Sequence, residues 1–230
     1  DNNGETVLFF EQHQGKAFDE FKLKVLDIST GIVKVALYED SDFNALSAKC
    51  HNLKTKPNEW VCSDGFAKFW RINTDDLWVN LIKDLSNESY YRTDVTAFEG
   101  IPDSDNVLFA LRSVNVAPNH SITESNFEGF KIFSPDNGLT SDLPSIQEYQ
   151  YAIPVNDSSI ILKDESRLQL YNVVSNTFTD ISTTQENSLI KDVLVLGDKA
   201  DIIVEKANSY GDSLQITSYN FNDNKIEESY

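Results

Sequence analysis

The chain has 230 residues, of which 40% are hydrophobic and 24% are charged, as in an ordinary folded globular protein. Its 37 acidic residues outnumber its 19 basic ones and give a formal net charge of −18, which repels nucleic-acid phosphates and anionic membrane surfaces. No stretch of the sequence approaches the roughly 18 uncharged apolar residues of a membrane helix. We therefore expect protein partners, and neither nucleic-acid binding nor membrane insertion.

Short apolar runs follow one another along the whole chain. They are rich in β-branched and aromatic residues and are bounded by Asn, Asp, Ser or Gly, which is typical of strands joined by tight turns. Apolar residues at helical spacing are nearly absent. The sequence therefore predicts an all-β protein. The runs, in chain order, are TVLFF, FKLKVLDI, IVKVALY, AKFWRI, LWVNLI, NVLFAL, FKIFS, SIILK, RLQLYNV, TFTDI, DVLVL, DIIVE and LQITSYN.

Five segments repeat one pattern, in which an apolar strand, a polar turn and a second strand follow one another. They are KVLDISTGIVKV, FWRINTDDLWVN, KIFSPDNGLTSD, QLYNVVSNTFTD and TSYNFNDNKIEE, with turn exits at Ile32, Leu77, Leu139, Thr177 and Lys225. Apart from an insertion in the third copy, the period is about 40 to 45 residues, the size of a four-stranded propeller blade. We predict a β-propeller, or part of one, with about five four-stranded blades. A β-sandwich or barrel is the alternative.

Two of the hairpins resemble known propeller repeats. The segment WVCSDGFAKFW resembles the second hairpin of a WD40 blade, with Trp70 near the place of that family's Trp, and LYNVVSNTFTDI is similar to a kelch hairpin. Ser63–Gly65 in the first segment is the predicted turn between the second and third strands of a blade, because Gly tolerates positive φ and Asp can bond its own backbone. No specific family is identified.

This resemblance implies a function as well as a fold. Degenerate propellers serve as rigid platforms in large scaffolds such as nucleoporins and vesicle coats. The first copy begins at its second strand, so we expect residues 1–230 to be a single all-β domain from a larger or processed protein. The remainder of the propeller would then lie in another segment or chain. Our main hypothesis is a non-enzymatic platform for protein–protein interaction, inside the cell.

The insertion NVAPNHSITESNFEG, residues 115–129, interrupts the third copy. Long loops on rigid scaffolds often carry binding residues. We predict that this segment is a surface loop that faces a protein partner. Its candidate contact residues are Val116, Asn119, His120, Ile122 and Phe127.

The sequence offers little catalytic or metal-binding chemistry. His13, His51 and His120 lie in polar stretches, and the chain has neither a Gly-X-Ser-X-Gly turn nor a phosphate-binding glycine loop. The calcium-like segment that starts at Asp40 has Ala45 where the loop requires Gly. Cys50, His51 and Cys62 lack a fourth zinc ligand at finger spacing. We therefore predict no catalytic residue, no cofactor and no metal.

Two alternatives stay open. In the first, the chain is a secreted or luminal module that binds a glycan or a receptor, with Cys50 and Cys62 joined in a disulfide and sugars on Asn-X-Ser/Thr sites. In the second, it is a carbohydrate-active propeller enzyme, which needs carboxylates about 5 to 9.5 Å apart. Its candidate carboxylates are Asp94, Asp157 and Asp192, near the starts of expected inner strands.

Overall fold

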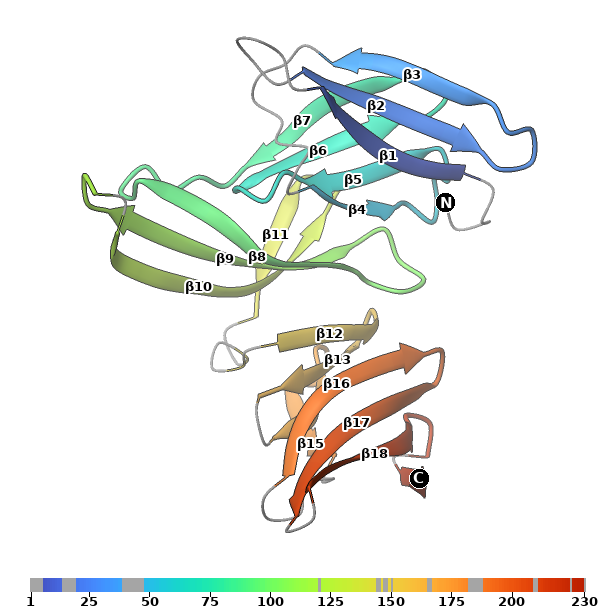
Figure 1. The fold of residues 1–230 in the computed structure, drawn as a ribbon, viewed down its shortest axis with the longest axis vertical. Coiled ribbons are helices and arrows are strands. Elements are labelled where there is room, and N and C mark those ends of the chain that lie inside the picture. Colours follow the sequence, from blue (N-terminus) through green and yellow to red (C-terminus); the bar gives the residue numbers. More distant parts are fainter. Residues whose placement is uncertain are drawn as a thin grey trace. The chain divides into compact units, whose positions relative to one another are not determined.

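The computed structural model is almost entirely β, with 68% strand and 1% helix, which confirms the predicted fold class (Figure 1). It describes residues 6–13, 20–38, 48–119, 121–143, 146, 149, 151–164, 167–181, 188–208, 211–223 and 225–229. Nowhere in these ranges is there a helix of the length and apolarity that a bilayer crossing needs. The chain groups into two compact units, residues 1–142 and 143–230. The expected single domain over residues 1–230 stays a prediction.

The first unit holds three antiparallel sheets, in which the strands follow chain order. The first sheet contains β1 (Thr6–His13), β2 (Glu20–Asp27) and β3 (Val33–Tyr38). The second contains β4 (Lys49–Asn52), β5 (Glu59–Ser63), β6 (Lys68–Asn73) and β7 (Trp78–Asp84). The third contains β8 (Arg92–Gly100), β9 (Val107–Val116), β10 (Ile122–Ser134) and β11 (Leu139–Asp142).

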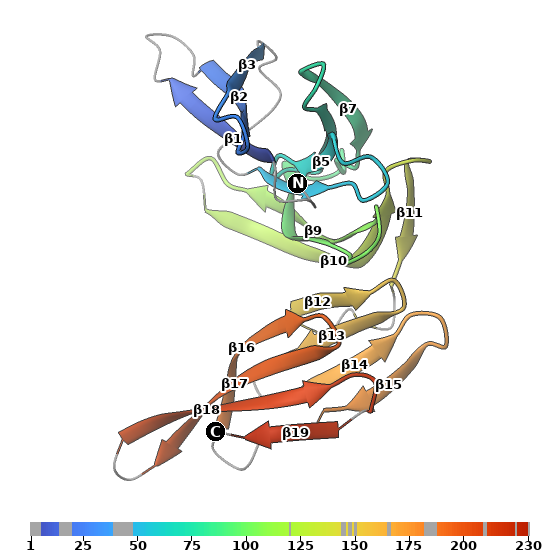
Figure 2. The same ribbon diagram turned by 90° about the vertical axis from the view of Figure 1, so that its right-hand side faces the viewer.

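The second unit holds two four-stranded sheets with the same simple order (Figure 2). One contains β12 (Tyr151–Asn156), β13 (Ser159–Lys163), β14 (Leu168–Asn172) and β15 (Thr177–Asp180). The other contains β16 (Ser188–Leu196), β17 (Lys199–Asn208), β18 (Gly211–Asn220) and β19 (Lys225–Ser229). These are the repeated blades that the sequence predicts, except that the first has three strands among the residues that the structure describes.

The repeated turn has one physical basis in nearly every copy. The strand before the turn ends in a residue whose side-chain oxygen accepts hydrogen bonds from the turn's own backbone, as Asn73 does from the backbone N–H groups of Asp75 and Asp76 at 2.9 Å each. Such side-chain caps replace backbone partners that a tight turn cannot supply. The equivalent residues are Asp27, Asn172 and Asn220.

Four residues beyond the end of that strand, the backbone turns left-handed. The residue at this position has positive φ in the four copies where it is described: Gly31 at 69°, Leu77 at 55°, Gly138 at 67° and Asn176 at 54°. The predicted exits at Ile32 and Leu77 are each one residue early, because the strands begin at Val33 and Trp78. A leucine occupies a position where glycine or asparagine would have marked the end of the turn.

Strand β4 was not expected from the sequence. Strand β4, Lys49–Asn52, is short, and its composition is polar apart from Cys50. It is placed by pairing with β5, with Cys50 opposite Cys62. Propensity alone does not identify a strand that is specified by its neighbour.

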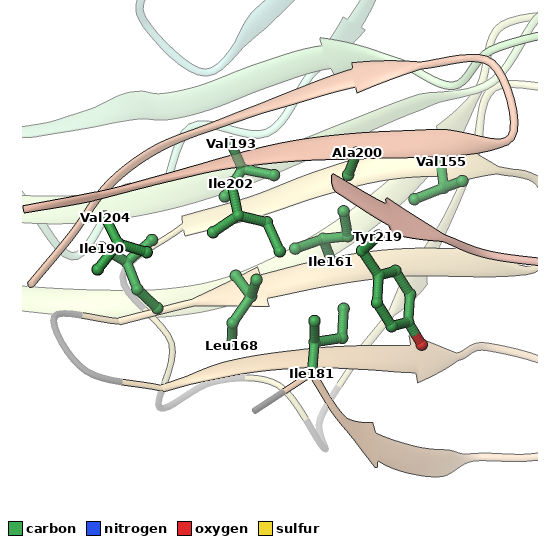
Figure 3. Close-up of a cluster of buried hydrophobic side chains, with 10 residues drawn as sticks. All are labelled: Val155, Ile161, Leu168, Ile181, Ile190, Val193, Ala200, Ile202, Val204 and Tyr219. Carbon is green, nitrogen blue, oxygen red and sulfur yellow. The ribbon is translucent and has the colours of Figure 1, made fainter. Parts of the chain in front are cut away.

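Apolar side chains from facing sheets form the cores. In the first unit, the ring of Phe69 in β6 stacks on that of Phe133 in β10, with 4.9 Å between the ring centroids. It also meets the ring of Phe109 in β9 edge-on, at the same centroid distance. In the second unit, Ile161 and Leu168 of one sheet face Ile202 of the other (Figure 3). Each sheet is thus stabilised mainly through the sheet beside it.

We expect the left-handed turn residue to tolerate Asn better than Ala. A Cβ built on Gly31 meets no heavy atom within 4 Å, and its φ is 69°, so only the backbone conformation opposes a side chain there. Gly31→Ala should reduce the free energy of unfolding by about 1 to 2 kcal/mol, and Gly31→Asn by less, because Asn populates this region more readily. Urea denaturation of both variants measures the difference. Equal losses would mean that the turn does not require positive φ.

Candidate functional site

The turn after β5 places a carboxylate inside the protein. Asp64 is 1% exposed, and its oxygens accept hydrogen bonds from the backbone N–H of Phe66 at 2.9 Å and from Nε1 of Trp70 at 3.4 Å. Burial raises the pKa of the Asp64 carboxyl above its ordinary value, and the hydrogen bonds only partly oppose this. Gly65 has φ of 83°, as predicted for this turn.

The same turn is joined to the neighbouring sheet. The carbonyl oxygen of Gly65 accepts a hydrogen bond from the backbone N–H of Val95 at 2.9 Å, and Phe66 forms an isolated antiparallel bridge with Asp94. The predicted turn therefore connects two sheets as well as two strands. These two contacts hold the turn against the first half of β8.

The carboxylates proposed for a carbohydrate-active site belong to three different sheets. Asp94 belongs to the first unit and pairs with Arg92 at 3.0 Å. Asp157 lies in the turn that follows the end of β12, whereas Asp192 is the middle residue of β16. Within the described ranges, no three His, Cys, Asp or Glu side chains are placed to hold a metal. The calcium-like segment at residues 40–45 lies outside those ranges.

A buried polar cluster that the sequence analysis missed lies at a bulge in β10. Glu128 is the extra residue between Phe127 and Gly129, where the register with β9 shifts and Gly129 has φ of 89°. Its carboxylate accepts hydrogen bonds from the Ser113 hydroxyl and, at 3.3 Å, from Nδ2 of Asn87. Gly129 is the available sequence signal, because a glycine within a strand often marks a bulge.

Two buried hydroxyl groups belong to this hydrogen-bonded cluster. Ser113 is fully buried, and Thr93 is 4% exposed, with 3.1 Å between their hydroxyl oxygens. The backbone N–H of Asn87 donates to the Thr93 hydroxyl at 3.1 Å. Ser113 is out of reach of a substrate, so the cluster fixes the base of the β9–β10 hairpin rather than supplying a nucleophile.

The predicted interaction loop is in large part an extension of that hairpin, which corrects our expectation. Ile122 pairs with Val116, and Phe127 pairs with Arg112. The polar residues of this segment predict a loop, but they pair with β9 as an exposed two-stranded ribbon. Asn119 lies at the turn and accepts a hydrogen bond from the Ser121 hydroxyl at 2.7 Å. His120 lies outside the described residues, and the partner role of this hairpin stays a prediction.

The two cysteines form a disulfide between paired strands. Their sulfur atoms are 2.02 Å apart and their Cα atoms 4.1 Å apart. Next to them, Nε2 of His51 lies 3.1 Å from the carbonyl oxygen of Ser104, and the ring covers Gly100 so closely that a Cβ there would be 1.9 Å from Nδ1. His51 is thus a packing residue between β4 and β8. His13 ends β1, where its backbone pairs with Glu20.

Ion pairs fasten the β4–β5 loop to the third sheet. Lys54 contacts Asp103 at 2.6 Å, and Lys56 contacts Asp136 at 2.7 Å. Arg71 lies 2.5 Å from Glu59 and 3.3 Å from Asp136. The hydrogen bond from Lys56, with help from Arg71, lowers the pKa of the Asp136 carboxyl. Ion pairs among three turns therefore hold the second and third sheets together at this end of the first unit.

Comparison with known proteins finds similarity in structure but not in sequence. No family model and no curated sequence matches the chain. An oligogalacturonate lyase solved in complex with manganese has a TM-score of 0.66 at 12% identity, over 99% of this chain and 74% of that one. A prolyl endopeptidase structure has a TM-score of 0.66 at 10% identity, and the match covers 99% of this chain but 33% of that one. The β-propeller domain of the Trilobed protease from Pyrococcus furiosus has a TM-score of 0.57 at 10% identity, and the match covers 97% of this chain and 67% of that one.

These similarities confirm the propeller fold and the resemblance to propeller repeats. They contradict our main functional hypothesis of a non-enzymatic platform, because the similar structures named above are enzymes or domains of enzymes. The hypothesis failed because stacked blades and variable loops are common to scaffolds and to enzymes, so composition and repeat pattern do not separate them. At such low identity the likeness establishes the fold and no particular reaction.

We expect the disulfide to contribute measurably to stability. Its cysteines are 12 residues apart, and closing a loop of this size removes about 2 to 3 kcal/mol of chain entropy from the unfolded state. The double variant Cys50→Ala/Cys62→Ala and the reduced wild-type protein should both unfold at lower urea concentration than the oxidised protein. Intact mass before and after reduction reports the bond itself. An unchanged midpoint on reduction would refute the contribution.

The Asp136 ion pairs should make stability depend on acid pH. Because its pKa in the folded protein is below the ordinary 3.8, its contribution is present above about that pH and is lost as pH falls through the folded value. Asp136 is half-exposed, so Asp136→Asn should cost only about 0.2 to 1 kcal/mol at pH 7. That difference should shrink toward pH 2 in urea titrations. The same loss at both pH values would contradict this assignment, and Asp157→Asn in an exposed turn is the matched control.

Proposed function

We propose that the chain is the β-propeller of a peptide-cleaving enzyme, and that the catalytic residues are supplied by another domain or subunit. The observation that carries this proposal is the unequal coverage of the match to the prolyl endopeptidases, which takes in 99% of this chain and 33% of theirs. The match to the propeller domain of the Trilobed protease supports the same role. In both cases the similarity concerns a propeller within a peptidase.

Charge favours a peptide substrate over an acidic sugar. Oligogalacturonate carries a carboxylate on every sugar unit, whereas this chain has a net charge of −18, so the two repel each other. Peptides that contain Lys or Arg are attracted by the same field. A propeller with this charge would raise the local concentration of cationic peptides near a catalytic domain.

The structure suits such an accessory role. Inter-domain dynamics are implicated in catalysis and specificity in the similar prolyl endopeptidases, and a domain that moves as a body must itself be rigid. In the first unit, rigidity comes from the Cys50–Cys62 disulfide, the Glu128 cluster and the ion pairs of Asp136. The disulfide joins two strands of one sheet, the Glu128 cluster joins β10 to β9 and to Asn87, and the ion pairs join turns of neighbouring sheets.

The test is hydrolysis by the intact protein as purified from its source, together with any subunit that accompanies it. Peptides of equal length carrying Lys or Glu should differ in kcat/KM, with the cationic peptide preferred at low salt. The preference should shrink as salt rises, because the Debye length falls from about 10 Å at 0.1 M to about 3 Å at 1 M. Heat-denatured protein is the control. Cleavage of oligogalacturonate without peptide hydrolysis would refute the proposal, as would cleavage of neither substrate.

A further inference from the structure

Three turns of the chain carry the sequence Asn-X-Ser, which is an acceptor for N-linked glycans. Their asparagines are Asn87, between β7 and β8, Asn119, between β9 and β10, and Asn156, at the end of β12. In all three, the side-chain oxygen accepts a hydrogen bond from the backbone N–H of the serine two residues further on, at 3.0 to 3.1 Å. The oxygen thus holds each turn, and the amide nitrogen Nδ2 remains for other contacts.

The Nδ2 atoms of the three asparagines differ in what they contact. Nδ2 of Asn87 donates to the Glu128 carboxylate at 3.3 Å, and Asn87 is half-buried. Asn119 and Asn156 are exposed. Their oxygens also accept a hydrogen bond from the hydroxyl of the same serine, at 2.7 and 3.0 Å. Within the part of the chain that the structure describes, no hydrogen bond involves the Nδ2 atoms of these two residues, so both nitrogens are available for a bond to another group.

A glycan needs space around the nitrogen as well as the nitrogen itself. Because the first sugar is bonded to Nδ2, it stands directly beside that atom. At Asn87 this place is next to the carboxylate of Glu128, which also accepts a hydrogen bond from a fully buried serine hydroxyl. A sugar there would disrupt a buried polar cluster, which is costly. At the other two sites the adjacent residues Pro118 and Asp157 are exposed. The fold therefore has room for a glycan at two of the three sites.

The disulfide is independent evidence on the compartment in which the chain folds. Cys50 and Cys62 are the two cysteines of the sequence, and they are bonded to each other. Disulfides form in oxidising compartments, such as the secretory lumen and the bacterial periplasm, and are rare in the cytosol. The secretory lumen is also the compartment in which N-linked glycans are attached. A chain that forms its disulfide there meets the glycan transferase with all three acceptor sequences.

We propose that Asn119 and Asn156 carry N-linked glycans and that Asn87 is unmodified. The donor is an oligosaccharide joined through C1 to a lipid pyrophosphate. The bond from C1 to the phosphate oxygen breaks and a bond from C1 to Nδ2 forms, so that the lipid pyrophosphate leaves and Nδ2 gives up one proton to a base of the transferase. This places the folding of the chain in the secretory pathway, in place of the expected location inside the cell. The inference does not depend on the peptidase assignment.

The test uses the protein purified from its source without reducing agent. Peptide-N-glycosidase converts a glycosylated asparagine to aspartate and takes an oxygen atom from water. Treatment in heavy-oxygen water therefore labels each site that held a glycan. Peptide mass spectrometry should find the label at Asn119 and Asn156, and an unlabelled asparagine at position 87. Incubation in the same water without the enzyme is the control for spontaneous deamidation.

Serine substitutions, expressed in the cells from which the protein comes, test the sites separately. Ser121→Ala and Ser158→Ala each remove one acceptor sequence, so each variant should lose one glycan and keep the other. Ser121→Thr retains the acceptor sequence and should retain the glycan. The matched control is Ser89→Ala, which removes the third acceptor sequence and should leave the loss of mass on glycosidase treatment unchanged. Because every variant keeps at least one expected glycan, that glycan reports that the chain still entered the secretory pathway.

The outcomes decide the proposal site by site. An intact mass that glycosidase does not change would overturn it completely. A missing label at Asn119 or Asn156 would overturn the assignment of that residue. A label at Asn87, or a glycan lost in Ser89→Ala, would overturn the inference that the hydrogen bond to Glu128 excludes a sugar.

Discussion

Burial between facing sheets is the interaction on which the rest of the structure depends. A three- or four-stranded sheet of short strands has too little apolar area to be stable alone. Phe69, between Phe109 and Phe133, shows how a blade gains stability from its neighbour. Turns and ion pairs can then be exposed without loss of the fold.

Much of the fold was predictable because the turns are specified locally. Asn73, Asn172 and Asn220 accept hydrogen bonds from backbone groups two or three residues away, so each turn carries its own signal regardless of tertiary contacts. That is why the strand boundaries at Leu139, Thr177 and Lys225 agree with the predicted turn exits. The predicted exits at Ile32 and Leu77 are each one residue early, and β4, which follows no such turn, was missed.

The contacts that organise the candidate site were not predictable in the same way. Glu128 reaches Ser113 and Asn87 only because a bulge redirects it. Lys56 meets Asp136 across 80 residues of sequence. Neither pairing leaves a periodic pattern, because each depends on how two sheets are placed. A sequence reading finds strands and turns, whereas side chains that meet across sheets require the fold first.

Asp64 shows that turn geometry can outweigh charge in this acidic protein. Its pKa is raised by burial, so the folded state binds its proton more tightly than the unfolded chain does. The stability gained from the neutral form is present below the ordinary value and is lost as pH rises through the folded pKa. Above the folded pKa the carboxylate is therefore held at some cost. It is retained there because its oxygens complete the turn at Phe66 and give the buried Trp70 N–H an acceptor. An unpaired donor in the core would itself cost about 1 to 3 kcal/mol. The buried acid Asp64 thus completes the turn that joins the second and third sheets. At the other end of these sheets, the exposed acids Asp103 and Asp136 join them through ion pairs.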